Sequence, residues 1–216
     1  MTIAVALAGK LKRDVRGIAL IELGLCLPLL LIATLWTFEY VNFCIVAQQI
    51  SQLALQVSDN AARIGTQNSI QTQIDEKQIN DLFQGAGLQS GSLALAQNGR
   101  VMLTSLEVDA GQPHGQYLHW QRCYGALHYQ SSYGRQGAGK GNNDVNGMGP
   151  GNARIVAAPG SPAMFVEIFY RYQPLISAHF APAETIHEIA AMMVRDNRDT
   201  SDPGVNPVDG VQASMC

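Results

Sequence analysis

The feature that most constrains this chain is an apolar run near its N-terminus. From residue 18 to residue 38 the only charged side chain is Glu22, and twelve of the 21 positions are Ile, Leu or Phe. As a helix this run would be about 31 Å long, which matches the hydrocarbon core of a bilayer. Inserting such side chains gains about 0.3 to 0.6 kcal/mol each, which together outweighs the penalty for one carboxylate. The sequence therefore predicts a membrane-spanning helix.

The residues before this run are basic. Residues 1–17 carry four Lys or Arg side chains against one Asp, a net charge of +3, whereas the whole chain of 216 residues has a net charge of −3. A basic flank predicts that the N-terminus stays in the cytoplasm and that the chain beyond the helix lies outside it. The acidic remainder argues against nucleic-acid binding.

A one-sided apolar stripe follows the run. Its members recur every three or four residues, with Asn60 filling one missing position: Phe43, Val46, Ile50, Leu53, Val57 and Ile64. This spacing is typical of an amphipathic helix. We therefore expect one helix over residues 18–64, ended by Gly65, whose second half is a spine that packs against a head. The alternative is a signal anchor followed by an ordinary domain helix.

The head, residues 65–195, is expected to combine helix and antiparallel strands, which makes the fold α+β. A short helix is predicted at 75–83, ended by Gly85 and Gly87. Asn98-Gly99 predicts a tight hairpin turn. The predicted strands are 92–97 and 100–109 on either side of that turn, then 117–123 and 164–172.

Three further segments are less regular. Residues 134–151 are rich in Gly and Asn and predict a mobile surface loop. Residues 185–195 fit either a helix or a strand. The polar tail, residues 196–216, is expected to be loosely ordered.

Four cysteines occur in two groups. Cys26 and Cys44 lie in or near the apolar segment, whereas Cys123 and Cys216 lie far downstream. If the downstream part is outside the cytoplasm, Cys123 and Cys216 could form a disulfide. The alternative is two free thiols, and the sequence leaves both open.

Several short segments resemble known site motifs but lack an essential residue. Residues 134–140 match the glycine pattern of a phosphate loop, but Gly141 stands where Ser or Thr should hold Mg²⁺. Residues 142–147 resemble a calcium loop without its final glutamate. His187-Glu188 begins a zinc motif that Ala191 leaves incomplete. The three histidines His114, His119 and His128 have no ligand partners at metal-site spacing. We predict no catalytic site, metal or cofactor.

Glu22 has two explanations. It could lie close enough to the headgroups to reach water. Alternatively, if a peptidase cuts after Gly17, Ile18 becomes the new N-terminus and its α-amine is positive at neutral pH. That amine could pair with Glu22 of a neighbouring copy, so that the carboxylate is neutralised only in an assembly.

This N-terminal pattern resembles the cleavage site of type IV prepilins, and more closely the TadE-like minor pilins, or pseudopilins, of tight-adherence (Tad/Flp) pili. Leu23, where major pilins carry Tyr, and a head that extends far beyond the helix resemble a minor subunit. The resemblance rests on Arg16-Gly17, the run Ile18-Ala19-Leu20-Ile21, Glu22, Leu27-Pro28-Leu29-Leu30, Trp120-Gln121-Arg122-Cys123, residues 164–172 and Pro174-Leu175.

The resemblance implies a function. A prepilin peptidase would remove residues 1–17, and the mature subunit would join, prime or regulate an adhesion pilus. Implied partners are that peptidase, other pilin and minor pilin subunits, the inner-membrane assembly platform with its ATPase, and membrane lipid. The protein would be single-pass in the bacterial inner membrane and not an enzyme, and residues 185–195 would be a strand. The alternative is an uncleaved, membrane-anchored extracytoplasmic binding module.

Overall fold

The computed structural model describes residues 17–67, 70–109, 111–112 and 115–216. The predicted basic leader therefore lies outside the described residues, apart from Gly17, and so does His114. The chain divides into two compact units. One comprises the described chain up to Phe43 together with Pro174–Pro182, and the other comprises Cys44–Gln173 with Ala183–Cys216.

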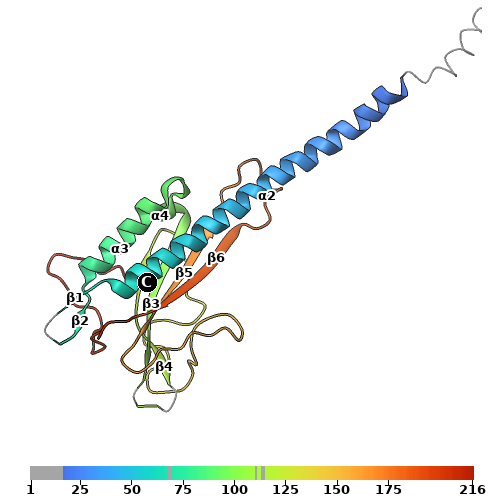
Figure 1. The fold of residues 1–216 in the computed structure, drawn as a ribbon. Helices are drawn as coiled ribbons and strands as arrows, with labels where there is room; N and C mark the ends of the chain where they lie inside the picture. Colours follow the sequence, from blue (N-terminus) through green and yellow to red (C-terminus); the bar gives the residue numbers. More distant parts are fainter. Residues whose placement is uncertain (1–16, 68–69, 110, 113–114) are drawn as a thin grey trace, which may run out of the picture. The chain divides into compact units, whose positions relative to one another are not determined.

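One long helix contributes to both units. Helix α2 runs from Ile18–Arg63 and continues through Pro28 (Figure 1). It ends within one residue of the predicted position, and Gly65 follows with a φ of 139°, a left-handed conformation that other residues rarely adopt. Of the helices that the structure describes, α2 is the one long and apolar enough to span a membrane, as judged by length and composition.

The first unit holds the apolar half of α2. Every residue from 17 to 38 is exposed, whereas Glu39 is fully buried. The Glu39 carboxylate accepts hydrogen bonds from three successive backbone N–H groups of the Pro174–Pro182 segment. A carboxylate on the helix therefore fastens a segment more than 130 residues away in the sequence.

The second half of α2 belongs to the head. Val46, Ile50, Leu53 and Val57 are buried, as the stripe predicts. Small residues of the same half of the helix, which the pattern did not include, are buried as well: Ala54, Ser58, Ala61 and Ala62. The buried face of the helix is therefore wider than the stripe of large apolar residues indicated.

A four-stranded antiparallel sheet forms the centre of the head. Its strands are β3 (Gly99–Val108), β4 (Gln116–Tyr124), β5 (Ala163–Arg171) and β6 (Thr185–Met193), in the order β4-β3-β5-β6. The strands predicted at 100–109, 117–123 and 164–172 are confirmed, and residues 185–193 of the ambiguous segment form a strand. The fold is therefore α+β, with a long N-terminal helix packed on a small antiparallel sheet.

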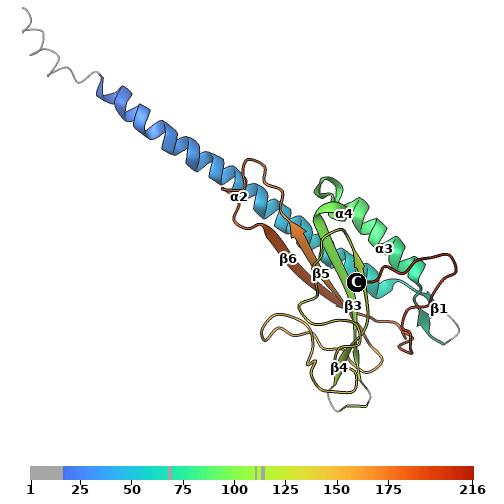
Figure 2. The ribbon, with the colours of Figure 1, turned by 180° about the vertical axis from the view of Figure 1, so that it is seen from behind.

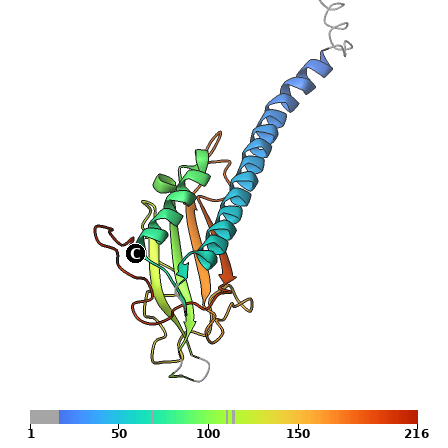
Figure 3. The same cartoon turned by 60° about the vertical axis from the view of Figure 1, so that its left-hand side comes forward.

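Helices cover one face of this sheet. Helix α3 (Glu76–Gln89) lies beside the second half of α2 (Figure 3). Asp75 caps α3, because its side chain accepts from Gln78 N while the Gln78 side chain accepts from Asp75 N. The prediction that Gly85 and Gly87 end this helix is wrong.

Gly87 has a packing role instead. A Cβ placed at Gly87 would lie 2.5 Å from the Tyr124 hydroxyl of β4, so a larger residue here would require the Tyr124 side chain to move. Phe83, one turn earlier, stacks on Tyr124 with ring centroids 5.8 Å apart. The glycine therefore lies inside the helix because it faces the sheet.

The hairpin predicted at Asn98-Gly99 is wrong. The residues before Gly99 form a 3₁₀ turn, η1 (Gly91–Leu93), and a short helix, α4 (Leu95–Asn98). Ala94 between them has a φ of 50°, which turns the chain so that Leu93 and Leu95 are both buried. The alternation that suggested a strand therefore has a different cause, and β3 pairs with β4 and β5.

Loops cover the other face of the sheet. A core cluster combines strand residues with Met148 and Ala157 from the long β4–β5 connection; its strand members are Leu106, Leu118, Ala163 and Phe165. Met148 is fully buried, and the backbone N–H of Gly137 donates to Leu118 O. Residues 134–151 are therefore a loop, as predicted, but one that packs onto the sheet.

The tail is also fixed to the head, which corrects the expectation of loose order. Residues of the tail pair with Thr72 and Asp75, beside the small ribbon of β1 (Thr66–Gln67) and β2 (Thr72–Gln73). Figure 2 shows this tail in dark red near β1. Farther on, Met215 pairs with Arg122 of β4, so the tail covers the free edge of that strand.

Candidate functional site

The residues predicted to direct processing, Gly17, Ile18 and Glu22, lie at the start of α2, and all three are exposed. The Gly17 carbonyl accepts the first helical hydrogen bond, from Ile21 N at 3.2 Å. A Cβ placed at Gly17 would meet no atom within 4 Å. The described fold therefore has no steric need for glycine at this position.

Glu22 lies within the apolar half of α2. Residues one turn away on its face, Ile18, Ala19, Leu25 and Cys26, carry no positive charge. No positively charged side chain therefore lies one helical turn from the Glu22 carboxylate. Cys26 and Cys44 are free and exposed thiols on the same helix.

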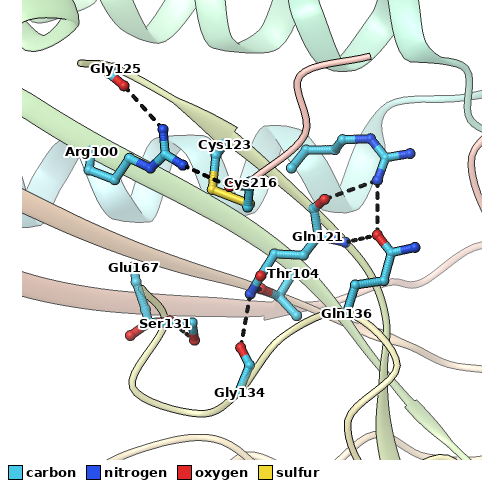
Figure 4. The surroundings of a disulfide bond; sticks show 11 residues. Arg100, Thr104, Gln121, Cys123, Gly125, Ser131, Gly134, Gln136, Glu167 and Cys216 are labelled. Atoms are coloured by element: carbon cyan, nitrogen blue, oxygen red, sulfur yellow. Dashed lines mark hydrogen bonds between the residues drawn. A yellow bond between two sulfur atoms is a disulfide. The ribbon is translucent and has the colours of Figure 1, made fainter. Parts of the chain in front are cut away.

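Cys123 and Cys216 form a disulfide and are not two free thiols. The backbone supports the bond, because Cys123 N donates to Ser214 O at 2.7 Å. Figure 4 shows Arg100 reaching toward the Cys216 carbonyl and toward Gly125. The bond joins the end of the tail to the β4 edge.

A cavity of about 430 Å³ opens beside this disulfide. Its polar lining consists of amides and hydroxyls with a single charged side chain, Arg135; the other contributors include Gln121, Tyr129, Gln130, Ser131 and Gln136. Figure 4 shows Gln121 directed at Thr104 and at the Gly134 carbonyl. This lining offers no acid–base pair of the kind that hydrolytic chemistry uses.

The phosphate-loop resemblance is not a phosphate site in the structure. Lys140 Nζ lies 3.0 Å from Asp202 Oδ2, and its charge lies over the Tyr117 ring. Gly141 N donates to Asp109 Oδ2 at 2.6 Å. Carboxylates therefore occupy both the lysine and the backbone donor that a phosphate would need.

Two of the histidines, His187 and His119, make structural contacts. His187 stacks on Phe169 with ring centroids 4.0 Å apart. His119 is buried in the head, with Nε2 lying 3.0 Å from Asp202 Oδ1. Within the described ranges, no three His, Cys, Asp or Glu side chains converge as a metal site would require.

His119 belongs to a polar cluster that the sequence analysis missed. Its Nδ1 lies 3.0 Å from Glu107 Oε1, and Glu107 also accepts from Ser105 Oγ and the Tyr117 hydroxyl. Burial lowers the pKa of His119, but the hydrogen bond and charge of Glu107, followed by Asp202, outweigh burial and raise it. Burial, with the charge of Glu107, raises the pKa of Tyr117.

A second missed feature is a buried ion pair. Arg122 of β4 donates to both carboxylate oxygens of Glu76, the first residue of α3, and both side chains are about 95% buried. Arg122 also donates to the Gln121 carbonyl and to Gln136. The available signal was Arg122 itself, an arginine within the strand predicted at 117–123. The pair fixes α3 on the sheet.

No family model, curated protein or solved structure matches this chain.

Proposed function

We propose that this protein is a membrane-anchored minor pilin, or pseudopilin, similar to the TadE-like subunits of tight-adherence pili. A prepilin peptidase would cut after Gly17, and the mature subunit would serve in pilus assembly. The observation that carries the proposal is the form of α2: one continuous helix whose first half is exposed all round and whose second half is packed into a head. An apolar helix exposed on every side needs lipid or other helices around it.

The N-terminal residues support the cleavage step. Gly17 lies next to the helix start with open space around it, and Ile18 would become the new N-terminus. Its amine would be positive at neutral pH. Glu22, four residues on, has no cation within its own helical turn, so the amine of a neighbouring copy would supply one. Assembly would thereby neutralise a carboxylate that is costly in lipid.

The disulfide supports an extracytoplasmic head. Disulfides persist in oxidising compartments and are rare in the cytoplasm. The basic leader also supports an extracytoplasmic head, because the positively charged flank of a membrane-spanning helix stays in the cytoplasm. The partners in this proposal are the peptidase, other pilin subunits, the inner-membrane platform and lipid. The protein is then a substrate of the peptidase and a structural subunit.

Cleavage is tested with matched glycine variants. Gly17→Ala and Gly24→Ala both place a methyl group in open space. When each is co-expressed with the peptidase, we expect Gly24→Ala to be shortened like the wild type and Gly17→Ala to stay full-length. If Gly17→Ala and the wild type are processed alike, or neither is processed, the proposal fails. A full-length chain in the membrane would favour the anchored binding module.

Incorporation is tested at Glu22. Glu22→Ala should be cleaved normally but be lost from sheared pilus fractions, whereas Cys26→Ala, one turn away, should behave as the wild type. Pilus fractions that contain Glu22→Ala at wild-type levels would refute the pairing with the Ile18 amine.

A further inference from the structure

The segment Pro174–Pro182 belongs to the same compact unit as the apolar half of α2. Its sequence, PLISAHFAP, contains no Asp, Glu, Lys or Arg. Leu175 is 67% exposed and Ile176 is 39% exposed, so these apolar side chains point away from the protein. A loop of this composition requires an explanation, because loops between strands are usually polar.

Glu39 fastens this loop. Its carboxylate accepts from the N–H groups of Leu175, Ile176 and Ser177 at 3.1, 2.7 and 3.3 Å. Consecutive N–H groups that converge on one anion form a compact nest. Glu39 is also the first charged residue after the apolar run of 18–38, so the loop is held where that run ends.

Most backbone N–H groups of the loop find an acceptor within the unit. Besides the three N–H groups on Glu39, the N–H groups of His179, Phe180 and Ala181 donate to Ser177 or Ala178 oxygens. Pro174 and Pro182 have no N–H. Six of the seven N–H groups between the prolines therefore donate inside the unit. Unsatisfied backbone groups are what excludes loops from the apolar part of a bilayer, and six of this loop's N–H groups are paired.

Aromatic side chains surround Glu39 in the sequence. Trp36 is 58% exposed, Phe38 64% and Tyr40 53%. Trp and Tyr gather where a membrane-spanning helix crosses the boundary between acyl chains and headgroups. The loop and these aromatics are therefore held at the same turn of α2.

We propose that Pro174–Pro182 is an interfacial loop whose Leu175 and Ile176 enter the headgroup–acyl boundary of the bilayer that α2 spans. The proposal rests on the membrane anchoring of α2 in the proposed function. Lipid is the occupant that fits, because the loop continues the lipid-exposed surface of the helix at its end. Glu39 acts as a clamp that keeps the loop at this depth.

The test uses the full-length chain in vesicles of phosphatidylcholine and phosphatidylglycerol. A single cysteine is labelled with an environment-sensitive fluorophore in a Cys26→Ser, Cys44→Ser background, with the head disulfide left oxidised. The labelled positions are Ile176→Cys, with Leu175→Cys as a second position, and Val156→Cys as control. Val156 is an equally apolar, 54% exposed loop residue of the other unit. Lipids brominated near the headgroup serve as quenchers.

We expect labels at 175 and 176 to be quenched at least threefold more than the label at 156. Glu39→Ala, and the milder Glu39→Gln, should reduce that quenching. Equal quenching at 156 and 176 would overturn the loop proposal, and quenching at 176 that is unchanged by both Glu39 variants would overturn the clamp.

A label on the native Cys26, in Cys44→Ser protein, separates the two proposals. If Cys26 is quenched by lipids brominated deep in the acyl chains while 176 is unquenched, the anchoring stands and only the loop proposal fails. If Cys26 is unquenched as well, the anchoring fails and the loop proposal fails with it.

Discussion

Buried charged side chains organise the head at the level of single residues. Glu76 and Arg122 join α3 to β4, and both are shielded from water. Glu107 and His119 form a second cluster that the tail completes through Asp202. Neither cluster could be predicted from the sequence, because each joins residues that lie far apart along the chain. Local spacing carries no information on such partners.

Removal of one member of the ion pair should destabilise the head strongly. Arg122→Ala leaves the Glu76 carboxylate buried without a cation, which costs about 3 to 5 kcal/mol in free energy of unfolding. The control is Arg63→Ala, which breaks the exposed Arg63–Asp59 pair at a cost below about 1 kcal/mol. Thermal unfolding of the full chain in detergent measures both. Equal melting temperatures for the two variants would contradict this role for Arg122.

His119 makes the stability of the head depend on pH. Because Glu107 and Asp202 raise its pKa against the effect of burial, the folded state holds a proton that the unfolded state releases above about pH 6.5. The stabilisation is complete below that pH and is lost as pH rises through the folded-state pKa.

Urea unfolding across this range should therefore show a free energy that falls with rising pH in the wild type. The slope should flatten in His119→Gln and persist in His128→Gln, a substitution at an exposed histidine. The same slope in His119→Gln as in the wild type would contradict the assignment.

At the scale of elements, α2 has two environments in one helix. Its composition predicted the apolar first half, which is exposed in the structure. Its period predicted the second half, which packs in the head. The turn at Ala94 was not predictable in the same way. The spacing of Leu93 and Leu95 imitates a strand, yet a positive φ between them buries both.

The packed half of α2 can be tested by truncating its buried face. Ile50 is fully buried, so Ile50→Ala should cost about 2 to 5 kcal/mol in free energy of unfolding. Leu55→Ala, at a 52% exposed position on the same helix, should be nearly neutral. Urea unfolding followed by the fluorescence of the buried Trp120 measures both. Similar values for the two substitutions would show that the helix does not pack as described.

At the scale of the whole molecule, the tail and the Pro174–Pro182 segment depart most from the expected organisation. The sequence suggested a head over 65–195 and a loose tail, since the tail is polar and holds two prolines. A disulfide and a paired strand edge fix the tail instead. The Pro174–Pro182 segment joins the α2 unit through Glu39, a contact that no local pattern encodes.

Reduction of the Cys123–Cys216 bond should loosen the tail. The bond closes a loop across 93 residues, and loss of such a bond typically costs about 2 to 5 kcal/mol. We expect a lower melting temperature in reductant for Cys26→Ser, Cys44→Ser protein, and no effect of reductant on the same protein with Cys216→Ser. Complete thiol labelling of both cysteines without reductant would show instead that the bond is absent.

The measurement that tests the central claim most directly is the intact mass of the untagged protein from the membranes of its own cells. The account predicts a chain that begins at Ile18, with residues 1–17 removed. A mass that corresponds to the full chain from Met1 would contradict it, because no free amine would then be available at Ile18 to pair with Glu22.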